Sequence, residues 1–147
     1  RQMCIRDSYE LEKKIFNENL SVKDIPNTWN QMFNEWFGIE VPEDRMGCLQ
    51  DIHWSMGAFG YFPTYTLGNL YAAQLLEAMS QEIGDVDEII ETGDWSPMLD
   101  WLRPKIHLQG SKLIPSELIE QATGVPPTPQ PIIDNVESKY SKLYNLS

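Results

Sequence analysis

The sequence predicts an all-α protein, made of several amphipathic helices and no sheet. Apolar residues recur at helical spacing through most of the 147 residues. Prolines and glycines stand at the ends of these periodic stretches, where they start and stop helices. No stretch alternates apolar and polar residues for long enough to predict a strand. The length is typical of about one domain, and 41% hydrophobic residues are enough to form a core.

Two helices are predicted in the N-terminal part. The first begins at Tyr9, and its apolar residues recur near helical spacing as far as Leu20. The second covers Ile25 to Phe37 and has the clearest amphipathic pattern in the chain. Pro26 stands at a first-turn position and Gly38 at the position of a helix-ending glycine. Its aromatic stripe is typical of a core-facing surface.

Residues 1–8 carry neither helical periodicity nor a capping residue. We expect them to be a non-native leader, followed by one helical region over residues 9–147. The chain also lacks methionine at position 1, and we expect its true beginning to be missing.

A long helix is predicted in the middle of the chain, from about Thr64 to Ile83. It is preceded by a short helix or helical turn over residues 44–54 and by a glycine-rich aromatic turn over residues 55–65. Gly84 is expected to end the long helix.

Four shorter helices are predicted in the C-terminal half, each bounded by proline or glycine. They are expected at residues 85–92, from Ser96 to Gly110, at residues 115–124 and from about residue 129 to 146. Pro104 lies inside the second and should kink or split it, because proline removes a helical hydrogen bond. The segment VPPTPQP is a rigid connector between the last two.

The composition argues against nucleic acid and membranes as partners and indicates the redox environment of the protein. The formal net charge of −11 argues against nucleic acid or an anionic membrane surface as the main partner, because both select for basic residues. No apolar run is long enough to predict a membrane-spanning helix. The two cysteines, Cys4 and Cys48, form no Cys-x-x-Cys motif, and they indicate a reducing, cytoplasmic environment.

The stretch from Gly47 to Gln74 combines glycines, aromatic rings and a histidine in a way that an ordinary core helix does not need. Glycine costs backbone entropy unless the conformation requires it, and a buried tyrosine needs a partner for its hydroxyl. The candidate site residues in and after its first motif are Gln50, Asp51, His53, Tyr61 and Tyr65. Taken alone, these residues predict a polar, aromatic cleft in a helical domain. A histidine in the core with tyrosines that merely pack is the other interpretation.

The sequence gives little support for a metal site or for a nucleophilic catalytic site. A zinc site needs about three protein ligands, whereas the only histidines, His53 and His107, are far apart and no His-Glu-x-x-His occurs. We expect His107 at the surface. Asp51, His53 and Ser55 are too close in sequence to form a triad on a helix, because such neighbours point apart. The proximity of Cys48 to His53 is dismissed for the same reason.

The motif GCLQDIHW resembles the G-x-x-Q-D-x-H-W motif of the Taq-type thermostable zinc carboxypeptidases, and FGYFPTYTLGNLYAAQ continues as that family does. Further blocks of the family's C-terminal region follow in the right order: VKDIPNTWN, FGIEVPED, GDWSPMLDWL, LIEQATG and KYSKLY. The resemblance covers Tyr9 to Leu146. It implies the C-terminal part of a multi-helix, neurolysin-like peptidase fold.

The resemblance also implies a function. Members of the family are cytoplasmic, commonly homodimeric zinc enzymes that release single residues from peptide C-termini with broad specificity. Their zinc ligands belong to a His-Glu-x-x-His motif and a downstream Glu, all upstream of the region seen here, so no metal ligand is expected in this chain. His53 and Tyr65 are then expected to be catalytic, as donors to an oxyanion or a substrate carboxylate. Gln50, Asp51 and Tyr61 are expected to bind substrate.

Trp54 of the motif is expected to pack in the core. The alternative function is a non-catalytic helical interaction module that kept the sequence pattern without the chemistry; an in-frame His-Glu-x-x-His upstream would decide for the enzyme.

Overall fold

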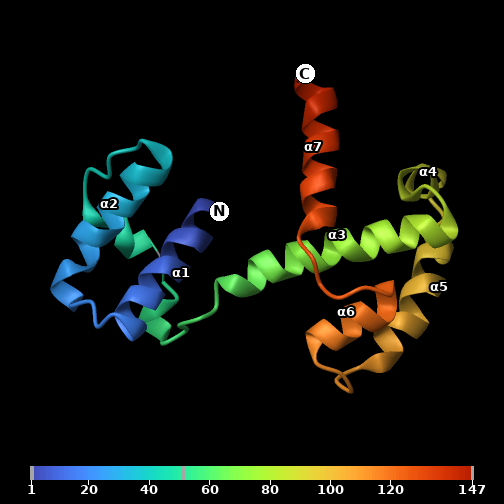
Figure 1. The fold of residues 1–147 in the computed structure, drawn as a ribbon, viewed down its shortest axis with the longest axis horizontal. Helices are drawn as coiled ribbons and strands as arrows, with labels where there is room; N and C mark the ends of the chain where they lie inside the picture. The colour runs from blue at the N-terminus through green and yellow to red at the C-terminus, as the bar shows by residue number, and fades with distance from the viewer. Residues whose placement is uncertain (1, 51, 147) are drawn as a thin grey trace. The chain divides into compact units, whose positions relative to one another are not determined.

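The computed structural model describes residues 2–50 and 52–146, and in these residues all regular secondary structure is helical (Figure 1). The all-α prediction is confirmed. The α-helices are α1 (Gln2–Asn17), α2 (Ile25–Phe37), α3 (Pro63–Ile83), α4 (Val86–Thr92), α5 (Ser96–Lys105), α6 (Pro115–Thr123) and α7 (Gln130–Tyr144). Short 3-10 helices are η1 (Val22–Asp24), η2 (Asp44–Met46), η3 (Cys48–Gln50), η4 (Trp54–Met56) and η5 (His107–Gln109).

The chain divides into two units, Arg1–Thr66 and Leu67–Ser147, and the boundary falls inside α3. Each unit has a core of its own. The buried residues of the first core are Leu11, Trp29, Met32 and Cys48. Those of the second are Ala78, Met79, Val86 and Trp101.

Helix α1 begins earlier than the apolar pattern predicts, at Gln2 instead of near Tyr9. The additional residues show no helical spacing of apolar side chains, yet two of them make contacts within the first unit. Ser8 is fully buried, and the guanidinium of Arg6 lies 4.1 Å from the ring centre of Trp36. The non-native origin of residues 1–8 stays a prediction.

Helix α2 agrees with its predicted limits and with its predicted core-facing stripe. Trp29 and Met32 are buried, and Phe33 and Trp36 pack against the same cluster. Gly38 ends the helix with a φ of +64°, and its N–H donates to the carbonyl of Asn34 at 2.8 Å. This left-handed conformation favours glycine, which has no Cβ to clash.

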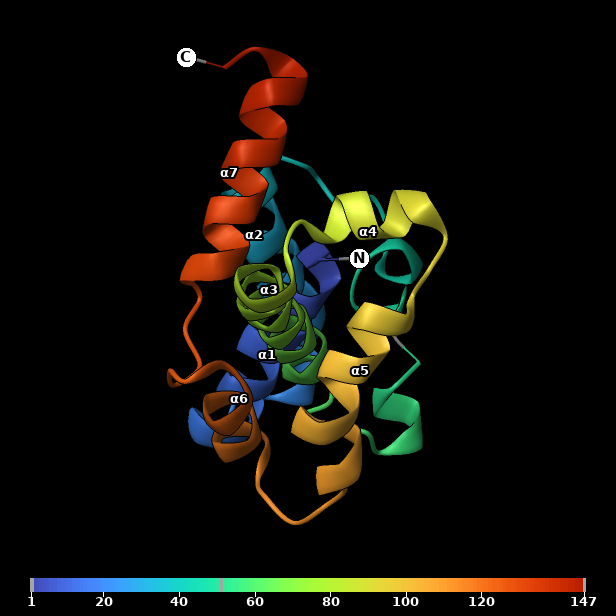
Figure 2. The same cartoon turned by 90° about the vertical axis from the view of Figure 1, so that its right-hand side faces the viewer.

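Helix α3 is central in the second unit. Seen nearly along its axis, α4, α5, α6 and α7 are distributed around it (Figure 2). Its residues Gln74, Ala78 and Met79 are buried, as expected for the predicted apolar face, whereas Leu67 on that face is exposed. Helix α5 ends one residue after Pro104 and is followed by η5, so the predicted split at this proline is confirmed.

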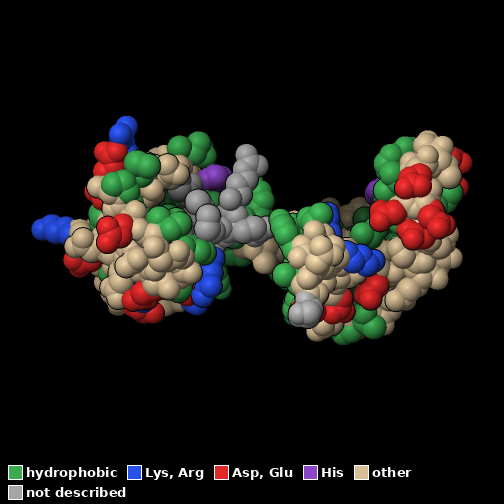
Figure 3. Space-filling model, turned by 90° about the horizontal axis from the view of Figure 1, so that it is seen from above, with side chains coloured by type: hydrophobic (Ala, Val, Ile, Leu, Met, Phe, Trp, Pro, Cys, Tyr) green, Lys and Arg blue, Asp and Glu red, His purple; other side chains and the backbone are tan. Residues whose placement is uncertain are grey.

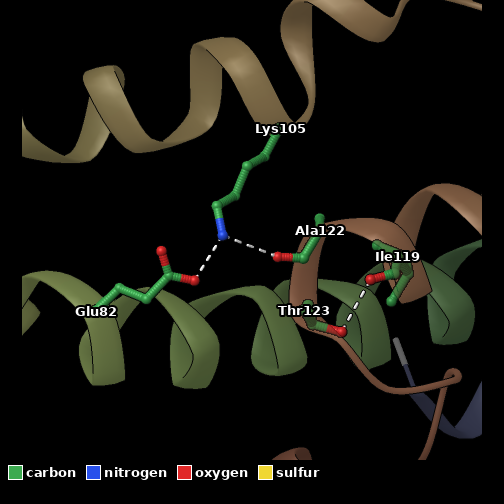
Figure 4. A network of polar contacts seen from close by, with 5 residues as sticks. All are labelled: Glu82, Lys105, Ile119, Ala122 and Thr123. Atoms are coloured by element: carbon green, nitrogen blue, oxygen red, sulfur yellow. Dashed lines mark hydrogen bonds and ion pairs between the residues drawn. The ribbon is translucent and has the colours of Figure 1, made fainter.

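Polar contacts join α3, α5 and α6 within the second unit. The ammonium group of Lys105 donates to Glu82 at 2.5 Å and to the carbonyl of Ala122 at 3.3 Å (Figure 4). The same lysine lies 4.7 Å from the ring centre of Trp101. Lys105 therefore connects three helices through its ammonium group.

Helix α4 carries much of the acidic surface of this unit (Figure 3). Asp87 and Glu88 lie in its first turn, where negative charge is favourable, and Asp85 caps it by accepting from the N–H of Asp87 at 2.8 Å. Within the described part of the chain, no helix combines the length and the apolar character that crossing a membrane requires.

Candidate active site

A tight loop, which we call the aromatic loop (residues 53–62), shapes the candidate site. The loop turns back on itself at its start, because the carbonyl of His53 accepts from the N–H groups of Met56 at 3.0 Å and Ala58 at 2.9 Å. Gly57 and Gly60 have φ values of +74° and +72°. Few residues other than glycine adopt this conformation, which explains the glycine spacing in the sequence.

The structure brings three of the predicted site residues together. The rings of His53 and Tyr61 are stacked, with centroids 4.9 Å apart and planes 21° apart. Tyr65, in the first turn of α3, meets Tyr61 edge to face at 5.3 Å, and its hydroxyl donates to that of Tyr61 at 3.3 Å. Buried Phe62 packs edge-on against His53 at 5.1 Å. His53, Tyr61 and Tyr65 thus form one ring cluster.

The ring cluster is accessible from solvent. Tyr61 is 42% exposed, Tyr65 is 45% exposed and His53 is half-buried. Two phenol groups and an imidazole can all donate hydrogen bonds, so the cluster is suited to bind an anionic or strongly polarised oxygen.

The other two predicted residues lie just before the loop. Gln50 is exposed at the end of η3, and its backbone N–H donates to the carbonyl of Gly47 at 3.0 Å. Asp51 lies outside the described residues. Gly47 itself is tightly enclosed, since a Cβ there would lie 2.7 Å from Cγ1 of Val41.

Glu12 of α1 is a residue that sequence reasoning missed. It is 4% exposed, and its two oxygens accept from the indole N–H of Trp54 at 2.8 Å and from the backbone N–H of Gly60 at 2.9 Å. The only sequence signal is its position directly after Leu11 on the core-facing side of the helix.

Trp54 packs in the core, as expected. It lies against the first core cluster, edge-on to Trp29 at 6.3 Å and stacked with Phe59 at 6.3 Å. Phe59 in turn meets Phe16 of α1 edge to face at 5.1 Å. Through these contacts, Phe59 holds the aromatic loop against α1 and Trp54 holds it against α2.

The dismissed nucleophiles have other roles in the structure. The Cys48 thiol is buried in the core, and this burial raises its pKa, which disfavours the reactive thiolate. The Ser55 hydroxyl donates to the carbonyl of Ile52 at 2.6 Å. His107 is exposed in η5, in agreement with its predicted surface position.

A metal site cannot be built from the residues that the structure describes. Among residues 2–50 and 52–146, no group of three or more His, Cys, Asp or Glu side chains is arranged to hold a metal ion. The described side chains therefore do not form a metal site by themselves.

Comparison with known proteins identifies relatives over nearly the whole chain. Carboxypeptidase 1 of Bacillus subtilis is 43% identical over 138 residues, which are 94% of this chain and 28% of that protein. Thermostable carboxypeptidase 1 of Thermus thermophilus is 42% identical over 92% of this chain and 26% of its own length. The chain thus spans between a quarter and a third of these relatives.

The fold and a family model agree with these relatives. The crystal structure of the M32 carboxypeptidase from Deinococcus radiodurans superposes with a TM-score of 0.93 at 32% identity, covering 99% of this chain and 29% of that one. The model of the carboxypeptidase Taq (M32) metallopeptidase family matches residues 3–140. The chain therefore belongs to the carboxypeptidase Taq (M32) metallopeptidase family.

Proposed function

We propose that this chain forms the substrate-facing wall, and the C-terminal part, of a zinc metallocarboxypeptidase that releases single amino acids from peptide C-termini with broad specificity. Membership of a metallopeptidase family and relatives named carboxypeptidases support the reaction class. The observation that carries the proposal is the exposed ring cluster of His53, Tyr61 and Tyr65 beside the motif GCLQDIHW.

The ring cluster has the chemistry that binding a peptide C-terminus requires. Peptide hydrolysis develops negative charge on the carbonyl oxygen, and the substrate's terminal carboxylate is itself an anion. We assign His53 and Tyr65 as donors to these oxygens, because donors that are held in place in advance stabilise developing charge. Tyr61, Gln50 and Asp51 are assigned to substrate binding.

The metal is assigned to residues outside this chain, because the described residues offer no set of three ligands. Zinc is the metal that the sequence resemblance implies. On the same basis we propose a cytoplasmic, homodimeric enzyme that acts on peptides, with neither nucleic acid nor a membrane as partner.

Zinc content and turnover of the purified 147-residue chain test this proposal. We expect no stoichiometric zinc and no release of C-terminal amino acids from peptides, whereas the longer enzyme that contains this segment should show both. One zinc per 147-residue chain together with turnover would contradict the assignment of the metal to other residues.

The gene offers a second test. We expect a His-Glu-x-x-His motif in frame upstream of the codon for Tyr9. An authentic start codon close to Tyr9 would contradict the enzyme and favour a non-catalytic interaction module.

A further inference from the structure

We propose that Glu12 is a positioning residue that sets the geometry of the His53–Tyr61 pair. The inference rests on the proposed function, in which these two side chains contact the substrate. Glu12 does not reach the ring cluster directly; it acts through the side chain of Trp54 at the start of the aromatic loop and through the backbone of Gly60 near its end.

The two hydrogen bonds of Glu12 attach to the residues next to the stacked rings. One oxygen accepts from Trp54, which follows His53 directly, and the other accepts from Gly60, which precedes Tyr61 directly. The two bonds are 2.8 Å and 2.9 Å long, so one carboxylate joins the two ends of the loop. Because one carboxylate accepts from both groups, Glu12 ties the Trp54 side chain and the Gly60 backbone to the same point of α1.

Helix α1 also contacts the aromatic loop at Phe59. Phe16 is four residues after Glu12 and therefore lies on the same face of α1. Its ring meets that of Phe59 edge to face at 5.1 Å. Helix α1 thus holds the loop at three positions, of which the two polar ones adjoin His53 and Tyr61.

The chemistry of the contact requires a carboxylate. Both partners are N–H donors, and a carboxylate accepts at both oxygens, whereas a carboxamide of the same shape would turn an N–H₂ group toward one of them. Burial makes this difference matter, because an unmatched polar group away from water is unfavourable. Glu12→Gln therefore loosens one end of the loop while it preserves side-chain volume.

Glu10 offers a matched control on the same helix. Its side chain is partly exposed and pairs with Lys13 at 2.9 Å, so Glu10→Gln makes the same chemical change away from the loop. Trp54→Phe is a second way to release the loop, because it removes the indole N–H and keeps an aromatic ring.

The test is a double-mutant cycle in the longer enzyme that contains this segment, with peptide hydrolysis per metal-loaded active site as the measurement. We expect Glu12→Gln to lower kcat/KM about tenfold or more, since small misplacements of catalytic groups have large effects. Glu10→Gln should leave kcat/KM unchanged. In a His53→Ala background Glu12→Gln should have little further effect, because the residue whose position it controls is already missing.

The cycle separates a positioning role from a merely structural one. If Glu12→Gln has the same effect with and without His53, positioning through His53 is overturned. If His53→Ala leaves kcat/KM unchanged, the proposed function fails first, and Glu12 then has no site to position. If Glu12→Gln does not fold, Trp54→Phe takes its place in the same cycle, with the same coupling to His53 expected and an additive result contradicting the proposal.

Discussion

In each unit of the protein, a buried polar side chain holds a segment that is distant in the sequence, and these two side chains differ in chemistry. In the first unit Glu12 accepts from Trp54 and Gly60, 42 and 48 residues along the chain. In the second unit Gln74, which is 2% exposed, holds the proline-rich connector between α6 and α7. One residue is a carboxylate and the other an amide.

The hydrogen-bonding groups of each segment explain why it is held by an amide in one unit and by a carboxylate in the other. The N–H₂ group of Gln74 donates to the carbonyls of Val125 at 3.1 Å and Pro126 at 3.2 Å, while its oxygen accepts from the N–H of Thr128 at 3.0 Å. The prolines of the connector have no N–H, so carbonyls outnumber donors and an amide can satisfy both. The aromatic loop instead presents two N–H groups, which a carboxylate matches.

The comparison suggests different roles for the two units. The loop held by Glu12 carries the ring cluster, in which Tyr61 and Tyr65 are exposed, whereas the connector held by Gln74 joins two helices. We therefore expect substitutions of the Gln74 contact to affect stability, and those of the Glu12 contact to affect catalysis as well.

The largest effect on stability is expected for Gln74→Ala. Removing the amide takes the Gln74 partner from the carbonyl of Pro126 and the N–H of Thr128, while the carbonyl of Val125 keeps the hydroxyl of Thr123 at 3.1 Å. We estimate that this lowers the free energy of unfolding by about 2–4 kcal/mol. Urea denaturation of the chain, with peptide-resolved hydrogen exchange in α6 and α7, measures it. Gln81→Ala, exposed on the same helix, is the control. Hydrogen exchange that became faster only in α1 and α2 would contradict the expectation that Gln74 stabilises the second unit.

A smaller effect is expected for glycine substitutions, with opposite signs in the two units. In the first unit Gly47→Ala places a Cβ 2.7 Å from Cγ1 of Val41 and 3.3 Å from Cδ1 of Trp29, and we expect about 1–3 kcal/mol of destabilisation. In the second unit Gly68→Ala meets open space inside α3, and alanine should stabilise the helix by about 0.5–1 kcal/mol. Equal midpoints of unfolding for the two variants would contradict this account.

The smallest effect is a dependence on pH in the second unit. The hydrogen bond from Lys105 lowers the pKa of Glu82 below its ordinary value of 4.5. Because the pKa is lower in the folded state, this contact stabilises the fold above the unfolded-state pKa, and its contribution is lost as the pH falls through the folded-state value.

Lys105→Met tests this pH dependence. The difference in urea midpoint between the wild type and the variant should be present at pH 7 and should shrink below about pH 4.5. Lys112→Met, at an exposed position, should show no such change. A difference that grew as the pH fell would contradict the assigned direction.

Local signals predicted the helices well. The stripe of α2, its glycine end, the split at Pro104 and the start of α6 at Pro115 all depend on neighbouring residues, so the sequence displays them. The start of α1 was predicted seven residues too late, because apolar residues do not recur at helical spacing in its first two turns. The segment over residues 44–54, predicted as a short helix or helical turn, contains separate 3-10 turns, with η2 and η3 on either side of tightly packed Gly47.

The site was predicted in part. His53, Tyr61 and Tyr65 come together because they lie within 13 residues of one another around a glycine-shaped loop. Glu12 could not be found in this way, because its partners lie more than 40 residues away and nothing near it in the sequence distinguishes it from a surface acid.

The central claim is that His53 acts on the substrate without holding the metal. The most direct test measures kcat/KM and zinc content on the same preparation of the His53→Ala variant of the longer enzyme. We predict a loss of about 100-fold or more in kcat/KM with zinc content unchanged, as expected when a donor to a developing oxyanion is removed. An unchanged kcat/KM, or a loss of zinc together with activity, would contradict the claim.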